Sequence, residues 1–208
     1  SLEVLSRLKD ENHRYINPEY FIHVAEINHT IIQLSRQMFE KTCRFAANNN
    51  IFDRGINDMN INISPIQCQD EHLVDELKRI AAKYRIPLKR FHFEITESKL
   101  TDANAVFDTL TKLRKCGAKV ALDDFGTGNN NMMAVDIFAP HIVKLDRSLI
   151  TDIENDVDKQ EYYYYYRDSF HKRGIKVLAE GIESREEYEF LRDNGIDLVQ
   201  GFYLGRPE

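Results

Sequence analysis

The stretch Leu122-Asp123-Asp124-Phe125-Gly126-Thr127-Gly128 places two adjacent carboxylates between an apolar run and a glycine-containing turn. Residues 118–122 are mostly apolar and include a β-branched valine, which predicts a buried strand that ends at the carboxylates. Successive side chains of a strand point to opposite faces, so we expect Asp123 to share the inward face of Ala121. Asp124 reaches the same site only if the backbone turns sharply, which the two following glycines permit. The alternative is that the pair merely caps the next helix.

Other predicted strands also carry polar residues near their ends. This recurrence favours a functional site at Asp123 and Asp124 over a simple helix cap. Their segments are MNINIS (59–64) with Asn60, Asn62 and Ser64, RFHFEIT (90–96) with Glu94, HIVKLD (141–146) with Lys144 and Asp146, and IKVLAE (175–180) with Glu180. Including 2–5, 118–123 and 197–200, we count seven strand candidates.

Segments with helical spacing of apolar residues alternate with these strands. They cover 21–27, 31–46, 73–84, 106–113, 162–170 and 188–191, and three glycines, Gly117, Gly174 and Gly195, follow helical segments as stop signals. Alternating strands and helices predict a parallel sheet, and in a closed barrel all strand carboxyl ends face one mouth. Seven strands are one fewer than an eight-stranded barrel requires. We expect a single domain over 1–208 that starts after its first strand, since Ser1 leads directly into an apolar strand.

These motifs together resemble the EAL domain, a family whose members hydrolyse the bacterial second messenger cyclic di-GMP. Glu3-Val4-Leu5 resembles the eponymous motif with Val in place of Ala, and Glu-x-Leu-x-Arg continues intact to Arg7. The further motifs, in the family's order, are PEYFI (18–22), NIS (62–64), FEITES (93–98), LDDFGTG (122–128), VKLDRS (143–148), LAEGIES (178–184) and QGFYLGRP (200–207). The resemblance implies an α/β fold, a TIM-like (β/α)8 barrel of the EAL type that lacks its first strand here.

The resemblance also assigns roles. It implies a metal-dependent phosphodiesterase that converts cyclic di-GMP to linear pGpG, with two ions polarising the phosphodiester and activating a water. The implied metal ligands are Glu3, Asn62, Glu94 and Asp123, with Asp124 helping to hold a second ion. All are oxygen donors, so Mg²⁺ or Mn²⁺ is expected over Zn²⁺. The other implied roles are catalysis by Glu180 as general base with Lys144 and Gln200, substrate binding by Arg7, Leu5 and Pro18, and loop support by Glu97, Glu183 and Asp146.

Taken singly, each of these residues also has an ordinary structural role, such as a solvated carboxylate, an ion-pair partner or a turn. One departure from the family bears on activity: after DDFGTG the chain has Asn129, Asn130 and Asn131 where the family has an aromatic and two small residues. We interpret this as tuned or reduced activity. The alternative is a catalytically weak or inactive domain that binds cyclic di-GMP as a receptor.

Composition fits an intracellular signalling domain. A net charge of -6 provides no basic footprint for duplex nucleic acid. Three widely spaced cysteines predict a reduced, cytoplasmic compartment, although membrane anchoring of a longer protein is left open. The resemblance implies a homodimer joined to sensor or GGDEF-type domains. The run Tyr162–Tyr166 covers all faces of a helix, so some rings should pack inside, and a base-stacking surface is the minor alternative.

Overall fold

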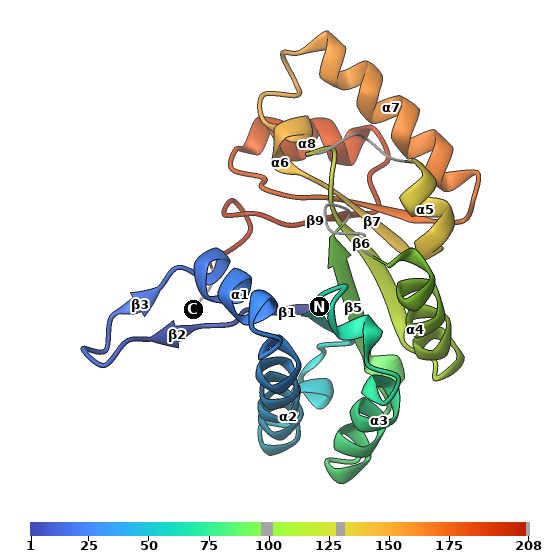
Figure 1. The fold of residues 1–208 in the computed structure, drawn as a ribbon. Coiled ribbons are helices and arrows are strands. Elements are labelled where there is room, and N and C mark those ends of the chain that lie inside the picture. Colours follow the sequence, from blue (N-terminus) through green and yellow to red (C-terminus); the bar gives the residue numbers. More distant parts are fainter. Residues whose placement is uncertain (97–101, 128–131, 207–208) are drawn as a thin grey trace. The chain divides into compact units, whose positions relative to one another are not determined.

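The computed structural model describes residues 1–96, 102–127 and 132–206 (Figure 1). The predictions made for Glu97 and for Asn129–Asn131 lie outside these residues. The chain divides into two compact units, the first comprising Ser1–Ile95 and Lys99–Lys119 and the second comprising Thr96–Ser98 and Val120–Glu208. None of the described helices is long and apolar enough to cross a membrane.

The first unit contains three parallel strands, β1 (Leu2–Val4), β4 (Met59–Asn62) and β5 (Phe91–Thr96), in that order. Its helices are α1 (Pro18–Ile27), α2 (Ile31–Asn48), α3 (Leu73–Lys83) and α4 (Ala103–Lys115), with short 3₁₀ turns η1 (Ile51–Arg54), η2 (Gln67–Gln69) and η3 (Leu88–Arg90). Phe39 of α2 packs against Phe91 and Phe93 of β5, with ring centroids 4.9 and 6.2 Å apart. The alternation of β5 therefore directs its aromatic face to the helices and leaves His92 and Glu94 on the opposite face.

An antiparallel hairpin precedes α1 and was not predicted from the sequence. Its strands β2 (Leu8–Lys9) and β3 (Tyr15–Ile16) each have two residues, too few to produce a periodic pattern. Figure 1 shows the hairpin projecting beside α1. Its turn is held by Asp10 Oδ1, which accepts hydrogen bonds from the backbone N–H groups of Asn12 and Arg14, both at 2.9 Å.

The second unit contains four parallel strands in chain order, β6 (Lys119–Phe125), β7 (Ile142–Leu145), β8 (Lys176–Ala179) and β9 (Leu198–Val199). Its helices are α5 (Met132–Phe138), α6 (Arg147–Ile150), α7 (Val157–His171) and α8 (Arg185–Asp193). The buried side chains of Ala121, Ile142 and Leu178 form a small core on one face of this sheet. Because side chains two residues apart on a strand share a face, this core directs Asp123 and Lys144 to the same side.

All seven predicted parallel strands are confirmed, and so are the helix ends at Gly117, Gly174 and Gly195, whose φ angles are 84°, 71° and 78°. Two short helices, α5 and α6, were not predicted. Helix α5 begins at Met132, shortly after the DDFGTG motif. With only seven residues in α5 and four in α6, neither helix provides two full repeats of apolar spacing.

The tyrosine run divides between core and surface, as the sequence predicted. Tyr163 and Tyr166 are buried, whereas Tyr162 and Tyr165 are exposed. The Tyr166 ring lies edge-on to Phe125 at 5.0 Å, and the Tyr163 hydroxyl donates a hydrogen bond to the carbonyl of Asn194 at 3.0 Å. The buried rings therefore fix α7 against its own unit.

Cysteine reactivity tests the packing of the first unit. Cys43 and Cys68 are buried, and burial raises the pKa of each thiol to about 12, while Cys116 is half-buried. Because the thiolate is the reactive form, we expect one fast-reacting thiol per folded chain at pH 8 and three after denaturation, measured with a chromogenic disulfide reagent. Rapid reaction of all three thiols in the folded protein would contradict this packing.

Candidate functional site

The backbone of β6 is irregular where the two aspartates lie. Leu122 pairs with Val143 and Phe125 pairs with Leu145, so Asp123 and Asp124 together lie opposite the single residue Lys144. Asp124 has a left-handed backbone with φ of 55°. This two-against-one arrangement is a β-bulge, which redirects a side chain that would otherwise point to the far face. The sharp turn that the sequence reading required thus begins at Asp124 itself, before the glycines.

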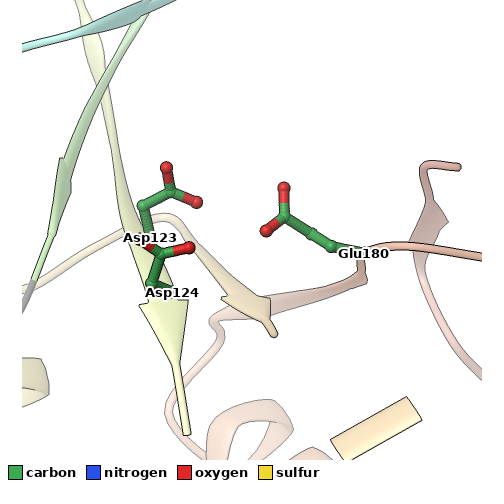
Figure 2. Close-up of side chains that lie close together, drawn as sticks. All are labelled: Asp123, Asp124 and Glu180. Carbon is green, nitrogen blue, oxygen red and sulfur yellow. The ribbon is translucent and has the colours of Figure 1, made fainter. Parts of the chain in front are cut away.

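The bulge brings both aspartates toward Glu180, which directly follows β8 (Figure 2). One carboxylate oxygen from each of Asp123, Asp124 and Glu180 lies within 4.8 Å of the others. Asp123 is buried, Glu180 is half-buried and Asp124 is exposed, so the cluster has an inner end and a solvent side. These residues were predicted to act together, and in the second unit they do lie together.

Lys144 is the buried cation of this cluster. Its ammonium Nζ lies 2.9 Å from Asp123 Oδ1 and 2.8 Å from Glu180 Oε1, and its side chain is only 2% exposed. Removing an ammonium from water is costly unless opposite charges compensate it, and the two carboxylates provide that compensation. Lys144 consequently fixes the relative positions of Asp123 and Glu180.

The charge of the cluster suits a divalent cation. The cluster combines three carboxylates with a single ammonium. Carboxylate oxygens are the donors that Mg²⁺ and Mn²⁺ prefer, and the cluster contains no histidine or cysteine. The donor set therefore fits the hard metal ions expected from the sequence.

Gln200, which follows β9, is tied to the backbone on both sides of Glu180. Its N–H donates to the carbonyl of Ala179 at 2.9 Å, and its carbonyl accepts from the N–H of Ile182 at 3.1 Å. This pairing places Gln200 next to the segment that presents Glu180. A water-orienting role for its side chain stays a prediction.

The two other polar residues predicted in this unit make local contacts. Asp146 caps α6 by accepting a hydrogen bond from the Ser148 N–H at 2.9 Å. Glu183 forms an ion pair with Arg147 at 3.3 Å, and both side chains are about half exposed. The Arg147–Glu183 ion pair connects the segment after β7 to the segment after β8. A supporting role for either acid in the site stays a prediction.

The predicted ligands Glu3, Asn62 and Glu94 belong to the first unit. Asn62 pairs in register with Glu94, and Glu3 pairs with Asn60 two residues earlier on β4, so all four side chains lie on one face. Glu94 is fully buried, and its Oε1 accepts a hydrogen bond from Asn60 Nδ2 at 2.9 Å. Sequence reasoning assigned no role to Asn60, although its alternation with Asn62 already placed it on the polar face.

The residues predicted to contact substrate also lie in the first unit. Leu5 follows β1 and is exposed, Arg7 is exposed and donates from Nη1 to the carbonyl of Ser6 at 3.0 Å, and Pro18 occupies the first position of α1. Their contacts with a nucleotide remain predictions.

Residues 1–207 match the EAL domain family, and the chain belongs to that family. Its strands and helices accordingly adopt the TIM-like α/β fold of EAL domains: 99% of the chain superimposes with a TM-score of 0.86 on 83% of the structure titled "PaMucR Phosphodiesterase, c-di-GMP complex", at 28% sequence identity.

Curated relatives are longer proteins. The chain is 31% identical over 208 residues to the signaling protein YkoW of Bacillus subtilis, covering 99% of the chain and 26% of YkoW. It is 31% identical over 209 residues to the cyclic di-GMP phosphodiesterase PdeR of Escherichia coli, covering 100% of the chain and 31% of PdeR. The chain thus spans about a quarter to a third of the length of these relatives.

Removing the Lys144 charge should destabilise the protein. In Lys144→Met the two carboxylates lose their buried cation, and we expect the free energy of unfolding in urea to fall by about 3 kcal/mol. Added Mn²⁺ should restore part of this loss because it supplies positive charge to the same carboxylates. Lys172→Met, which changes an exposed lysine, is the matched control. Equal stabilities of the two variants would show that Lys144 does not hold the cluster.

Proposed function

We propose that this chain is a metal-dependent phosphodiesterase that hydrolyses cyclic di-GMP to linear pGpG. The observation that carries the proposal is the cluster of Asp123, Asp124 and Glu180 around buried Lys144, a set of groups able to hold a divalent cation. Family membership supports the choice of substrate, because relatives are named as cyclic di-GMP phosphodiesterases and a similar structure is titled as a complex with c-di-GMP.

The residues of the second unit have different roles in the proposed reaction. Asp123 and Asp124 would hold a divalent ion, which when bound polarises the phosphodiester and lowers the pKa of a neighbouring water. Glu180 accepts the proton of the attacking water as general base. Lys144 contacts Oε1 of Glu180, which fixes the plane of the carboxylate. The position of the second carboxylate oxygen is therefore fixed as well.

The bond changes define the product. The water oxygen forms a new bond to one phosphorus, the bond from that phosphorus to the 3′ oxygen breaks, and the leaving oxygen takes up a proton. The result is a linear dinucleotide with a 5′ phosphate. Glu3, Asn62 and Glu94 are the ligands that we propose from the first unit, with Arg7, Leu5 and Pro18 contacting the nucleotide.

A relative supports the proposal that this domain works together with other signalling domains. One relative of 30% identity is a bifunctional diguanylate cyclase and cyclic di-GMP phosphodiesterase of Pseudomonas aeruginosa, of which the chain matches 30% of the length. This supports GGDEF-type domains as partners within one protein. Dimerisation of the EAL domain and a cytoplasmic location of its site belong to the proposal as well.

Turnover is tested directly with purified protein. Cyclic di-GMP is incubated with Mg²⁺ or Mn²⁺, and pGpG is followed by chromatography with a chelator control. We expect product only when the metal is present. If calorimetry detects binding of cyclic di-GMP but no pGpG forms, the chain is a cyclic di-GMP receptor and the enzyme proposal is wrong.

The role of Glu180 has its own test. Glu180→Gln keeps the shape of the side chain but cannot take up a proton, so kcat should fall by about 100-fold or more while nucleotide binding persists. The control is Glu186→Gln, which changes an exposed glutamate of α8 and should leave kcat unchanged. A Glu180→Gln variant with the parent rate would remove Glu180 from the mechanism.

A further inference from the structure

Glu187 is a buried acid of α8 that lies outside the carboxylate cluster. Its side chain is 4% exposed, and its two oxygens accept three backbone hydrogen bonds. Oε1 accepts from the N–H of Asp152 at 3.1 Å, and Oε2 accepts from the N–H groups of Glu183 at 2.9 Å and Ser184 at 3.1 Å. The Glu187 N–H in turn donates to Ser184 Oγ at 3.1 Å, which completes a capping box at the start of α8.

The bond to Asp152 is not part of a helix cap. A capping box requires only the contacts within residues 184–187. Asp152 is 35 residues earlier in the chain, in the turn after α6, and it has a left-handed backbone with φ of 59°. Glu187 therefore connects two segments, 147–155 after β7 and 180–184 after β8.

These two segments present the central pair of the site. The first follows the strand that carries Lys144, and the second begins with Glu180, whose carboxylate contacts Lys144 at 2.8 Å. The segments also meet directly, because a Cβ at Gly181 would lie 2.5 Å from the Cβ of Arg147. Only glycine allows this approach, and Gly181 also has a φ of 71°.

The charge of Glu187 matters for this connection. Burial opposes ionisation, but the backbone donors of Glu183, Asp152 and Ser184 outweigh it and hold the pKa of the Glu187 carboxyl below its usual value. An ionised carboxylate accepts at both oxygens, whereas an amide must turn its NH₂ group toward one side. Glutamine at this position would therefore face one set of backbone N–H groups with a donor.

We infer that Glu187 is a positioning residue for the hydrolysis: its carboxylate fastens the segment after β7 to the segment after β8 and so keeps Glu180 aligned with Lys144. It touches neither the substrate nor the reacting atoms. This inference rests on the proposed function for its catalytic consequence, but the connection between the two segments can be measured without turnover.

The kinetic test compares two halves of the same capping box. Glu187→Gln replaces one acceptor oxygen with a donor and so interrupts the connection between the two segments, whereas Ser184→Ala removes only the hydroxyl that caps α8. We expect Glu187→Gln to lower kcat by at least about tenfold with KM changed less than twofold, because outer contacts that orient a catalytic group act on the rate. Ser184→Ala should lower Tm and leave kcat unchanged. The inference fails if Glu187→Gln retains the parent kcat, or if both variants lose kcat in proportion to their loss of Tm.

Amide hydrogen exchange tests the connection between the two segments without any measurement of activity. In Glu187→Gln the remaining side-chain oxygen can keep the capping-box contact, so exchange should accelerate at Asp152, whereas in Ser184→Ala the amide of Asp152 should stay protected. If the parent protein produces no pGpG, the proposed function fails. The exchange data still show whether Glu187 connects the two segments. Unchanged exchange at Asp152 in Glu187→Gln would overturn it.

Discussion

The second unit depends on one buried contact, the Lys144 ammonium held between Asp123 and Glu180 at 2.9 and 2.8 Å. An ammonium that is 2% exposed is tolerable only with opposite charges in direct contact. The same contact that compensates the lysine fixes two acids of neighbouring strand ends. The buried charge and the arrangement that we propose for phosphodiester hydrolysis thus involve the same three side chains.

The backbone around this contact is shaped to add a third carboxylate. The β-bulge opposite Lys144 and the left-handed conformation of Asp124 turn its side chain toward the others, at a cost of about 1 kcal/mol or more for a residue other than glycine. Strain of this kind persists where the surrounding structure enforces it. Here Leu122 and Phe125, which flank the bulge, are buried and pair with residues of β7, and the third carboxylate increases the negative charge available to a cation.

Much of the architecture could be predicted from the sequence, because strands with apolar alternation and helices closed by glycine leave strong local signals. The hairpin β2–β3 and the helices α5 and α6 were missed because each is too short to show a period. The meeting of Asp123, Lys144 and Glu180 followed from their places at strand ends. The bulge at Asp124 could not be predicted, because a glycine-rich sequence after a strand permits several backbone conformations. The role of Glu187 was open to prediction in part: Ser184-x-x-Glu187 is a capping-box pattern, but its bond to Asp152 is a tertiary contact that no local pattern contains.

The central claim, that the cluster around Lys144 is a site for a divalent cation, is tested most directly by diffraction from crystals soaked in Mn²⁺. The account predicts an anomalous difference peak coordinated by oxygens of Asp123 and Asp124, with Lys144 still in contact with Glu180. A well-ordered cluster at saturating Mn²⁺ without such a peak would contradict it.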